Sequence, residues 1–144
     1  MITIKKIDNK KDLATAQQIR HEVFVVGQNV PVEDEVDAFE NSCSHYLAFF
    51  NNKPVGAARW RVTENGIKLE RFSVIREFRG RGAGAALVEK VLKDVRNSEE
   101  GKGKSIYLHA QVEVVPFYRR YGVRKVGDMF DESGILHYKM VLEE

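Results

Sequence analysis

The sequence is poor in cysteine, and its single cysteine, Cys43, cannot form a disulfide bond within the chain. A chain without internal disulfides suits a reducing compartment, so we expect a cytoplasmic protein. Long hydrophobic runs are also missing, since no window approaches the roughly 18 uncharged apolar residues that a membrane-spanning helix needs. The first residues, 1–6, lack the apolar core and cleavage site of a signal peptide. We therefore expect a soluble protein with no membrane partner.

An excess of either charge is missing too. The 23 basic and 21 acidic residues leave a formal net charge of +2. This is too little for a protein that binds nucleic acid mainly by neutralising phosphates. The histidines at 21, 45, 109 and 137 never come within the short spacing of metal ligands. We therefore expect neither a nucleic-acid partner nor a bound metal.

The most informative stretch runs from Ser73 to Gly84 and joins a predicted strand to a predicted amphipathic helix. Glycines at 80, 82 and 84 leave room for backbone N–H groups to surround an anion. The following helix adds the positive end of its dipole and its unpaired first-turn N–H groups. Positive charge nearby comes from Arg76, Arg79 and Arg81. The stretch predicts a phosphate or pyrophosphate site, with a tight turn that binds nothing as the alternative.

Of two other phosphate-binding motifs, one is absent from the chain and the other matches this stretch only loosely. The P-loop pattern Gly-x-x-x-x-Gly-Lys-Ser/Thr occurs nowhere in the chain. The spacing Gly80-x-Gly82-x-x-Ala85 matches a loose dinucleotide fingerprint. However, the next predicted strand ends in His109-Ala110-Gln111, without an acid for a ribose. Dinucleotide binding is therefore weakly supported.

Periodicity and turn signals predict the other elements. A short strand at 2–7 precedes a helix that Asp12 can cap and that Gly27 ends. Asn65-Gly66 predicts a hairpin turn, and a short helix is expected over 116–122. Further strands are expected over 45–50, 55–62, 67–74, 105–110, 123–130 and 136–142. The order predicts one α/β domain over residues 1–144, with an antiparallel sheet that becomes parallel at its middle and helices on both faces.

Residues 28–43 lose periodicity and form an acidic loop, which contains Glu33, Asp34, Glu35, Asp37 and Glu40. A loop of this length is a candidate for function. The alternative is a solvated loop, because exposed acids need no function.

These features together resemble a known family. Arg79-x-x-Gly82-x-Gly84 between a strand and a helix is similar to the acetyl-CoA pyrophosphate loop of the GNAT (Gcn5-related N-acetyltransferase) superfamily. Residues 108–111, followed by 116–122, resemble its next strand and helix. Further blocks resemble the ElaA/YjcF-like branch of bacterial acetyltransferases; they are residues 20–31, Glu35-x-Asp37, Gly134-Ile135-x-His137 and Met140. The resemblance spans almost the whole chain.

The resemblance implies the GNAT acyl-CoA acyltransferase fold, with a mixed sheet of six to seven strands. Its central parallel pair would splay apart and admit the pantetheine arm of acetyl-CoA. The implied activity is transfer of an acetyl group from acetyl-CoA to a primary amine of a small molecule or peptide, by direct attack through a tetrahedral intermediate. The alternative is a module that binds or senses acyl-CoA without turnover. Whether the chain forms a homodimer stays open.

The resemblance also assigns residues to the cofactor. The pyrophosphate is expected on backbone amides of residues 79–84, and the acyl arm along the end of the central strand. The residues expected to bind acetyl-CoA are Phe72, Ser73, Val74, Arg79, Gly80, Arg81, Gly82, Ala83, Gly84 and Phe117.

Tyr118 matches the tyrosine that family members place beside the CoA sulfur, and a phenol with a reference pKa of about 10 suits a general acid. The alternative is that the aromatic residues of this short helix only pack. Glu70 is the first choice for the general base, because it shares the face of Val74 if the strand is regular, whereas a bulge would reverse this. His109 and Glu113 are further candidates, and an amine that arrives deprotonated needs no base.

The acceptor is expected to lie beside the acidic loop. Five acids in a short span predict a negative potential that draws a cationic amine. Glu35 and Asp37 match the pattern of the branch and are the predicted substrate-binding residues. For the other three acids of the loop, the expected role is to keep the loop soluble.

Overall fold

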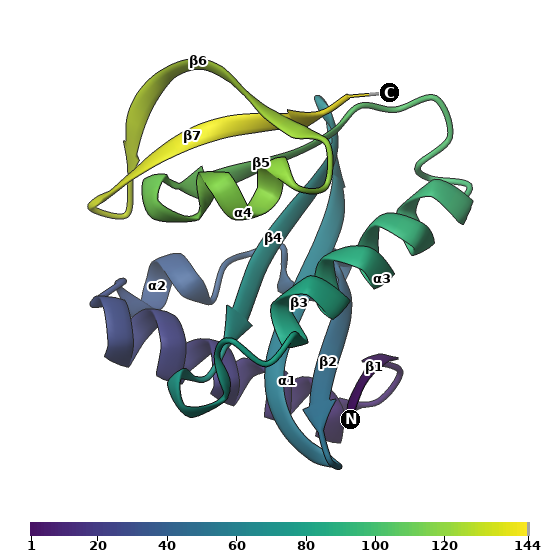
Figure 1. Ribbon diagram of the computed structural model, residues 1–144, viewed down its shortest axis with the longest axis vertical. Helices are drawn as coiled ribbons and strands as arrows, with labels where there is room; N and C mark the ends of the chain where they lie inside the picture. The colour runs from purple at the N-terminus through teal and green to yellow at the C-terminus, as the bar shows by residue number, and fades with distance from the viewer. Residues whose placement is uncertain (144) are drawn as a thin grey trace.

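The computed structural model describes residues 1–143, in which seven strands form one mixed sheet of order β1-β2-β3-β4-β5-β7-β6 (Figure 1). The strands are β1 (Ile2–Lys6), β2 (Ser44–Phe50), β3 (Lys53–Thr63), β4 (Gly66–Val74), β5 (Ile106–Gln111), β6 (Val123–Glu132) and β7 (Ile135–Leu142). The pair β4–β5 is parallel and the other neighbours are antiparallel. The predicted antiparallel sheet with a parallel pair at its middle is confirmed.

Helices cover both faces of the sheet, as predicted. Tyr46 and Ala48 of β2 belong to the large core that contains α3, whereas Leu47 packs with Ala16 and Ile19 of α1. Alternate residues of a strand point to opposite faces, so α1 and α3 lie on opposite sides. The helical segments are α1 (Lys10–Arg20), the π-helix η1 (His21–Val26), α2 (Val32–Glu35), η2 (Glu40–Ser42), η3 (Arg76–Phe78), α3 (Ala83–Asn97), η4 (Val112–Val114) and α4 (Val115–Arg119). Within residues 1–143, none is long and apolar enough to cross a membrane.

The first helix begins earlier than predicted. Asn9 is its N-cap, and the Asn9 side-chain oxygen accepts a hydrogen bond from the backbone N–H of Asp12 at 2.8 Å. Asp12 therefore lies in the first turn, and the prediction that it caps the helix is wrong. An asparagine with extended backbone satisfies one of the unpaired N–H groups, as capping requires. Gly27 closes the π-helix that continues α1, as predicted.

The parallel pair is short, and this creates the opening that the resemblance implies. Ladder pairing of β4 with β5 covers Ile67–Leu69 and Ile106–Leu108. Beyond these residues β4 continues to Val74 and β5 to Gln111 without pairing to each other. The carboxyl ends of the two strands therefore splay apart.

A bulge interrupts β4 at Arg71 and Phe72. Ser73 pairs with Ala57, and Glu70 pairs with Arg59, so two residues of β4 oppose one of β3. Arg71 has a left-handed backbone conformation, with φ of +61°. The bulge reverses the alternation, so Glu70 and Val74 lie on opposite faces, and the expectation for a regular strand is wrong.

Candidate active site

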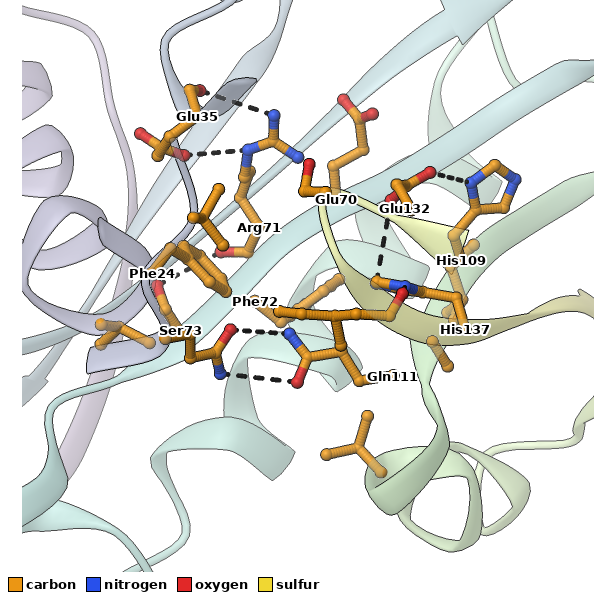
Figure 2. A pocket seen from close by; sticks show the side chains of 18 of the residues that line it. Phe24, Glu35, Glu70, Arg71, Phe72, Ser73, His109, Gln111, Glu132 and His137 are labelled. Atoms are coloured by element: carbon orange, nitrogen blue, oxygen red, sulfur yellow. Dashed lines mark hydrogen bonds and ion pairs between the residues drawn. The ribbon is translucent and has the colours of Figure 1, made fainter. Parts of the chain in front are cut away.

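A cavity of about 800 Å³ lies where β4 and β5 splay apart (Figure 2). Residues 72–74 of β4 and 108–111 of β5 line it. Val23 and Phe24 of η1 contribute apolar surface, and Glu132 and His137 come from the β6–β7 hairpin. Phe117 and Tyr118 of α4 also line it, so the cavity has apolar surface from η1 and α4 and a polar end at the hairpin.

Tyr118 forms part of the apolar wall. Its ring packs edge-on against those of Phe72 and Phe117, with centroid separations of 6.1 and 5.1 Å. Burial raises the pKa of the Tyr118 phenol, which is therefore protonated at neutral pH. Within residues 1–143 the Tyr118 hydroxyl has no hydrogen-bond partner and is not fully buried, so it is free for a ligand in the cavity.

The glycine turn leads directly into α3. Gly80 and Gly82 have φ of +77° and +95°, which explains the need for glycine. A Cβ atom on either would meet no atom within 4 Å, so these glycines border open space. Arg79 ties the turn to the end of β4, because its Nε donates to the carbonyl oxygen of Val74 at 2.9 Å. The guanidinium of Arg81 lies over the aromatic ring of Phe50, 5.3 Å from the ring centroid.

His109 and Glu132 form a hydrogen-bonded pair at the polar end (Figure 2). Nδ1 of His109 lies 2.9 Å from Oε1 of Glu132. A carboxylate accepts, so Nδ1 carries a proton, and in the neutral tautomer with this proton the lone pair is on Nε2. The hydrogen bond from His109 lowers the pKa of Glu132. This arrangement leaves His109 able to accept a proton.

Three residues of the acidic loop belong to a buried ion-pair network. Arg20, 1% exposed, donates to Glu35 at 2.9 Å and to Glu40 at 2.7 Å. Arg59, fully buried, donates to Glu40 at 2.7 Å and to Asp37 at 2.6 Å. The two arginines therefore share Glu40 between them.

Arg71 joins this network from the bulge. Its Nε donates to Glu35 at 2.9 Å, and its Nη2 donates to Asp37 at 3.2 Å. Glu35 and Asp37 line the cavity as predicted, but arginines neutralise both. The alternative of a solvated acidic loop is therefore wrong for these two residues, and the solubility role predicted for Glu40 is wrong because Glu40 is buried. Their predicted role in binding the acceptor stays a prediction.

Glu70 lines the cavity, and three cationic side chains surround its carboxylate. Its carboxylate lies 3.0 Å from Arg59, 2.9 Å from Arg61 and 3.1 Å from Lys68. Burial opposes ionisation of Glu70, but the positive charges outweigh burial and lower its pKa. A carboxylate in this state is a weak base. Glu113, the third candidate, does not line the cavity.

Two hydrogen-bonded bridges connect the N-terminal segment with the other side of the cavity. Gln28 and Gln111 form a reciprocal amide pair whose shorter bond is 2.8 Å (Figure 2). Ser133, between β6 and β7, donates to Asp34 of α2 at 3.0 Å. Elements that are 83 and 99 residues apart in sequence thus enclose one space.

The family model for the acetyltransferase (GNAT) domain matches residues 11–144. The chain belongs to the GNAT acetyltransferase family. The chain is 37% identical to the uncharacterized N-acetyltransferase YjcF of Bacillus subtilis, and the match covers 92% of this chain and 94% of YjcF. It also matches the crystal structure of Escherichia coli ElaA, with 26% identity, a TM-score of 0.85 and coverage of 99% and 100%. Arabidopsis thaliana Naa50, in complex with the bisubstrate analogue CoA-Ac-MVNAL, shares the fold at 21% identity and a TM-score of 0.72, with coverage of 96% and 97%.

The GNAT fold brings most of the predicted residues to one place. Of the predicted acetyl-CoA residues, those lining the cavity are Phe72, Ser73, Val74, Arg79, Gly84 and Phe117. Gly80, Arg81, Gly82 and Ala83 form the adjoining turn and helix start. Sequence reasoning missed Glu132 as the partner of His109, because the two are 23 residues apart and no local pattern connects them.

Proposed function

We propose that this GNAT domain transfers the acetyl group of acetyl-CoA to a primary amine by direct attack of the amine on the thioester. One observation carries the proposal: the hydroxyl-bearing Tyr118 and the Glu132-oriented His109 line one cavity, at the point where β4 and β5 separate. Family membership supports acyl transfer. The CoA-derived analogue bound to Naa50, which has this fold, supports CoA as the donor.

The glycine turn fits the pyrophosphate of acetyl-CoA. Gly80 and Gly82 border open space, and the first N–H groups of the 15-residue helix α3 follow directly. The acyl arm would run along residues 72–74 toward Tyr118. When bound, acetyl-CoA supplies the thioester carbonyl that the amine attacks. Backbone N–H groups near Ser73 and Val74 are our candidates for polarising this carbonyl.

His109 is the better candidate for the general base than Glu70. Nε2 of His109 has a free lone pair in the neutral ring, whereas three cations hold the carboxylate of Glu70 in its ionised form. Nε2 accepts a proton from the amine as the bond between nitrogen and carbonyl carbon forms. Tyr118 donates its proton to the departing sulfur as the carbon–sulfur bond breaks. The two transfers leave His109 protonated and Tyr118 ionised, and transfer of one proton from His109 to Tyr118 through solvent restores both residues.

Binding of CoA is tested at Gly84, which lines the cavity. A Cβ atom there would lie 3.6 Å from the Phe117 ring, an ordinary contact, so substitution fills space without straining the backbone. Gly84→Val should weaken CoA binding at least about tenfold in calorimetry. Ala14→Val, on the exposed surface of α1, controls for a β-branched residue in a helix. Gly82→Val is less informative, since its φ of +95° adds strain. Equal affinity of a folded Gly84→Val variant would refute the site.

Catalysis is tested by thiol release from acetyl-CoA with a library of primary amines. Tyr118→Phe and His109→Gln should each lower kcat by about 10²-fold or more and leave CoA affinity close to normal. Glu70→Gln decides between the two candidate general bases. A larger loss of kcat in Glu70→Gln than in His109→Gln would assign the general base to Glu70. CoA binding without thiol release from any amine would favour a sensing module.

A further inference from the structure

Charged side chains of both signs line the cavity. Arg61 and Lys68 lie opposite each other in the β3–β4 ladder, and both line the cavity. Glu132 lines it from the β6–β7 hairpin, and the exposed Asp34 lies beside the same hairpin through its bond to Ser133. Arg61 and Lys68 thus form a basic end and Glu132 and Asp34 an acidic end, and the two are near enough for the charge of Lys68 to lower the pKa of Glu132.

The basic end carries a positive charge that no carboxylate within ion-pair distance balances, although the charge of Lys68 also lowers the pKa of the more distant Glu132. The ion-pair network that includes it joins five cations with four carboxylates: Arg20, Arg59, Arg61, Lys68 and Arg71 with Glu35, Asp37, Glu40 and Glu70. Arg61 and Lys68 reach no carboxylate of this network except Glu70, which Arg59 also contacts. The excess of one positive charge therefore falls at Arg61 and Lys68.

Both cations have unused donors. The guanidinium of Arg61 stacks on the Phe39 ring, 3.9 Å from its centroid, and donates to Glu70 through Nε. Within residues 1–143 its two terminal nitrogens have no hydrogen-bond acceptor. The ammonium of Lys68 has one carboxylate partner, Glu70, for three N–H bonds. The side chains of Arg61 and Lys68 are each 15% exposed, so an anion bound here would be largely shielded from water. Such an anion would accept strong, charge-assisted hydrogen bonds.

The basic end lies close to the proposed base. Lys68 pairs with Tyr107 in the β4–β5 ladder, and His109 is two residues further along the same face of β5. Two residues of a strand span about 6.6 Å, so a small molecule reaches from His109 to Lys68. An amine held beside His109 and Glu132 can therefore place an anionic group at Arg61 and Lys68.

We infer that the acceptor is an amino carboxylate, a primary amine whose own carboxylate is bound by Arg61 and Lys68. The inference rests on the proposed acetyl transfer for the position of the amine. The acidic end attracts the ammonium form of the acceptor and the basic end binds its carboxylate, so the two charges of the acceptor match the two ends of the cavity. The ammonium loses one proton to solvent before the neutral amine attacks, and His109 takes the second proton as the amide bond forms. The chemical class includes free amino acids with α-, β- or γ-amino groups.

The test compares amino acids with their carboxamides as acceptors, in thiol release and in calorimetric binding to the CoA-loaded protein. The acids should show at least about tenfold higher kcat/KM than the amides. Lys68→Met should remove most of this preference by raising KM for the acids at least about tenfold more than for the amides. Lys139→Met is the matched control, since Lys139 pairs with His109 in the β5–β7 ladder but does not line the cavity.

Each result supports or overturns the inference on the acceptor, and one of them also tests the proposed function. Turnover of amides as good as that of acids would overturn the inference and leave the acetyltransferase intact. Preferential binding of the acids without turnover would support the inference and refute the proposed function. Absence of preference in both turnover and binding overturns the inference. Unfolding temperatures of both methionine variants show whether a loss of preference arises from a loss of fold.

Discussion

Arg71 combines a backbone conformation that is unfavourable for its residue type with a side chain that binds two carboxylates. Its φ of +61° costs a non-glycine residue roughly 1–2 kcal/mol. Hydrogen bonds to Glu35, Asp37 and the carbonyl of Asp34 offset this cost. Such charged hydrogen bonds contribute about 1.5–3 kcal/mol each, but the side chain is 21% exposed, so we take about 2–3 kcal/mol for the set.

Two substitutions separate the backbone from the side chain. Arg71→Ala loses the ion pairs and keeps the unfavourable φ, whereas Arg71→Gly loses the same ion pairs and relieves the φ. The alanine variant should be less stable than the wild type by about 2–3 kcal/mol. The glycine variant should recover about 1 kcal/mol of that loss. At about 3 °C per kcal/mol for a chain of this size, the alanine variant should unfold about 6–9 °C below the wild type and about 3 °C below the glycine variant.

Thermal unfolding followed by circular dichroism, with urea unfolding as the second probe, measures both differences. An alanine variant as stable as the glycine variant would show that the left-handed conformation costs nothing. A glycine variant more stable than the wild type would show that the ion pairs contribute less than the strain. Either result would refute the reasoning that the side chain of Arg71 stabilises the bulge.

Two further predictions follow from pKa shifts in the same region. Burial opposes ionisation of Glu40, but hydrogen bonds from Arg20 and Gln17 outweigh it and lower the pKa from 4.5 to about 2. Since the pKa of Glu40 is lower in the folded than in the unfolded chain, its stabilisation is present above about pH 4.5 and is lost as pH falls toward 2. The unfolding temperature should therefore drop across this window. The drop should be less steep in Glu40→Gln. Burial raises the pKa of the Cys43 thiol to about 11, so iodoacetamide at pH 8 should alkylate it at least about tenfold more slowly than in guanidinium. Equal alkylation rates in the folded and unfolded chain would contradict a raised pKa for this half-buried thiol.

The parts of the fold that were predictable depend on local signals. Asn65-Gly66 predicted the turn into β4, and Gly66 has φ of +131°, a value that suits glycine. The same glycine has a second role that no local pattern reveals, because a Cβ atom on it would collide with the carbonyl of Ser105 at the start of β5. The glycine turn before α3 was predictable for the same local reason, since Gly80 and Gly82 both adopt positive φ.

The unpredicted features depend on partners distant in sequence. Glu35 looked like an exposed acid because nothing near it in sequence neutralises its charge, yet Arg20 and Arg71, 15 and 36 residues away, enclose it. The bulge at Arg71 has no glycine to signal it. An acidic run in a loop therefore predicts a negative potential only when the arginines of other elements are known to lie elsewhere.

The ion-pair network has a consequence for how substitutions outside the cavity should be interpreted. Arg59 is fully buried and contacts Asp37, Glu40 and Glu70, so removal of its side chain would leave three carboxylates without their shared partner. Loss of one partner from a buried ion pair typically costs about 3–5 kcal/mol, whereas well-packed apolar side chains can replace a whole pair at little cost. Stability alone therefore does not explain why the network is ionic. Its directional bonds do fix α2 against the bulge of β4, and both border the cavity. Arg59 does not line the cavity, yet it holds residues that do, so its substitution should change the binding of the acceptor.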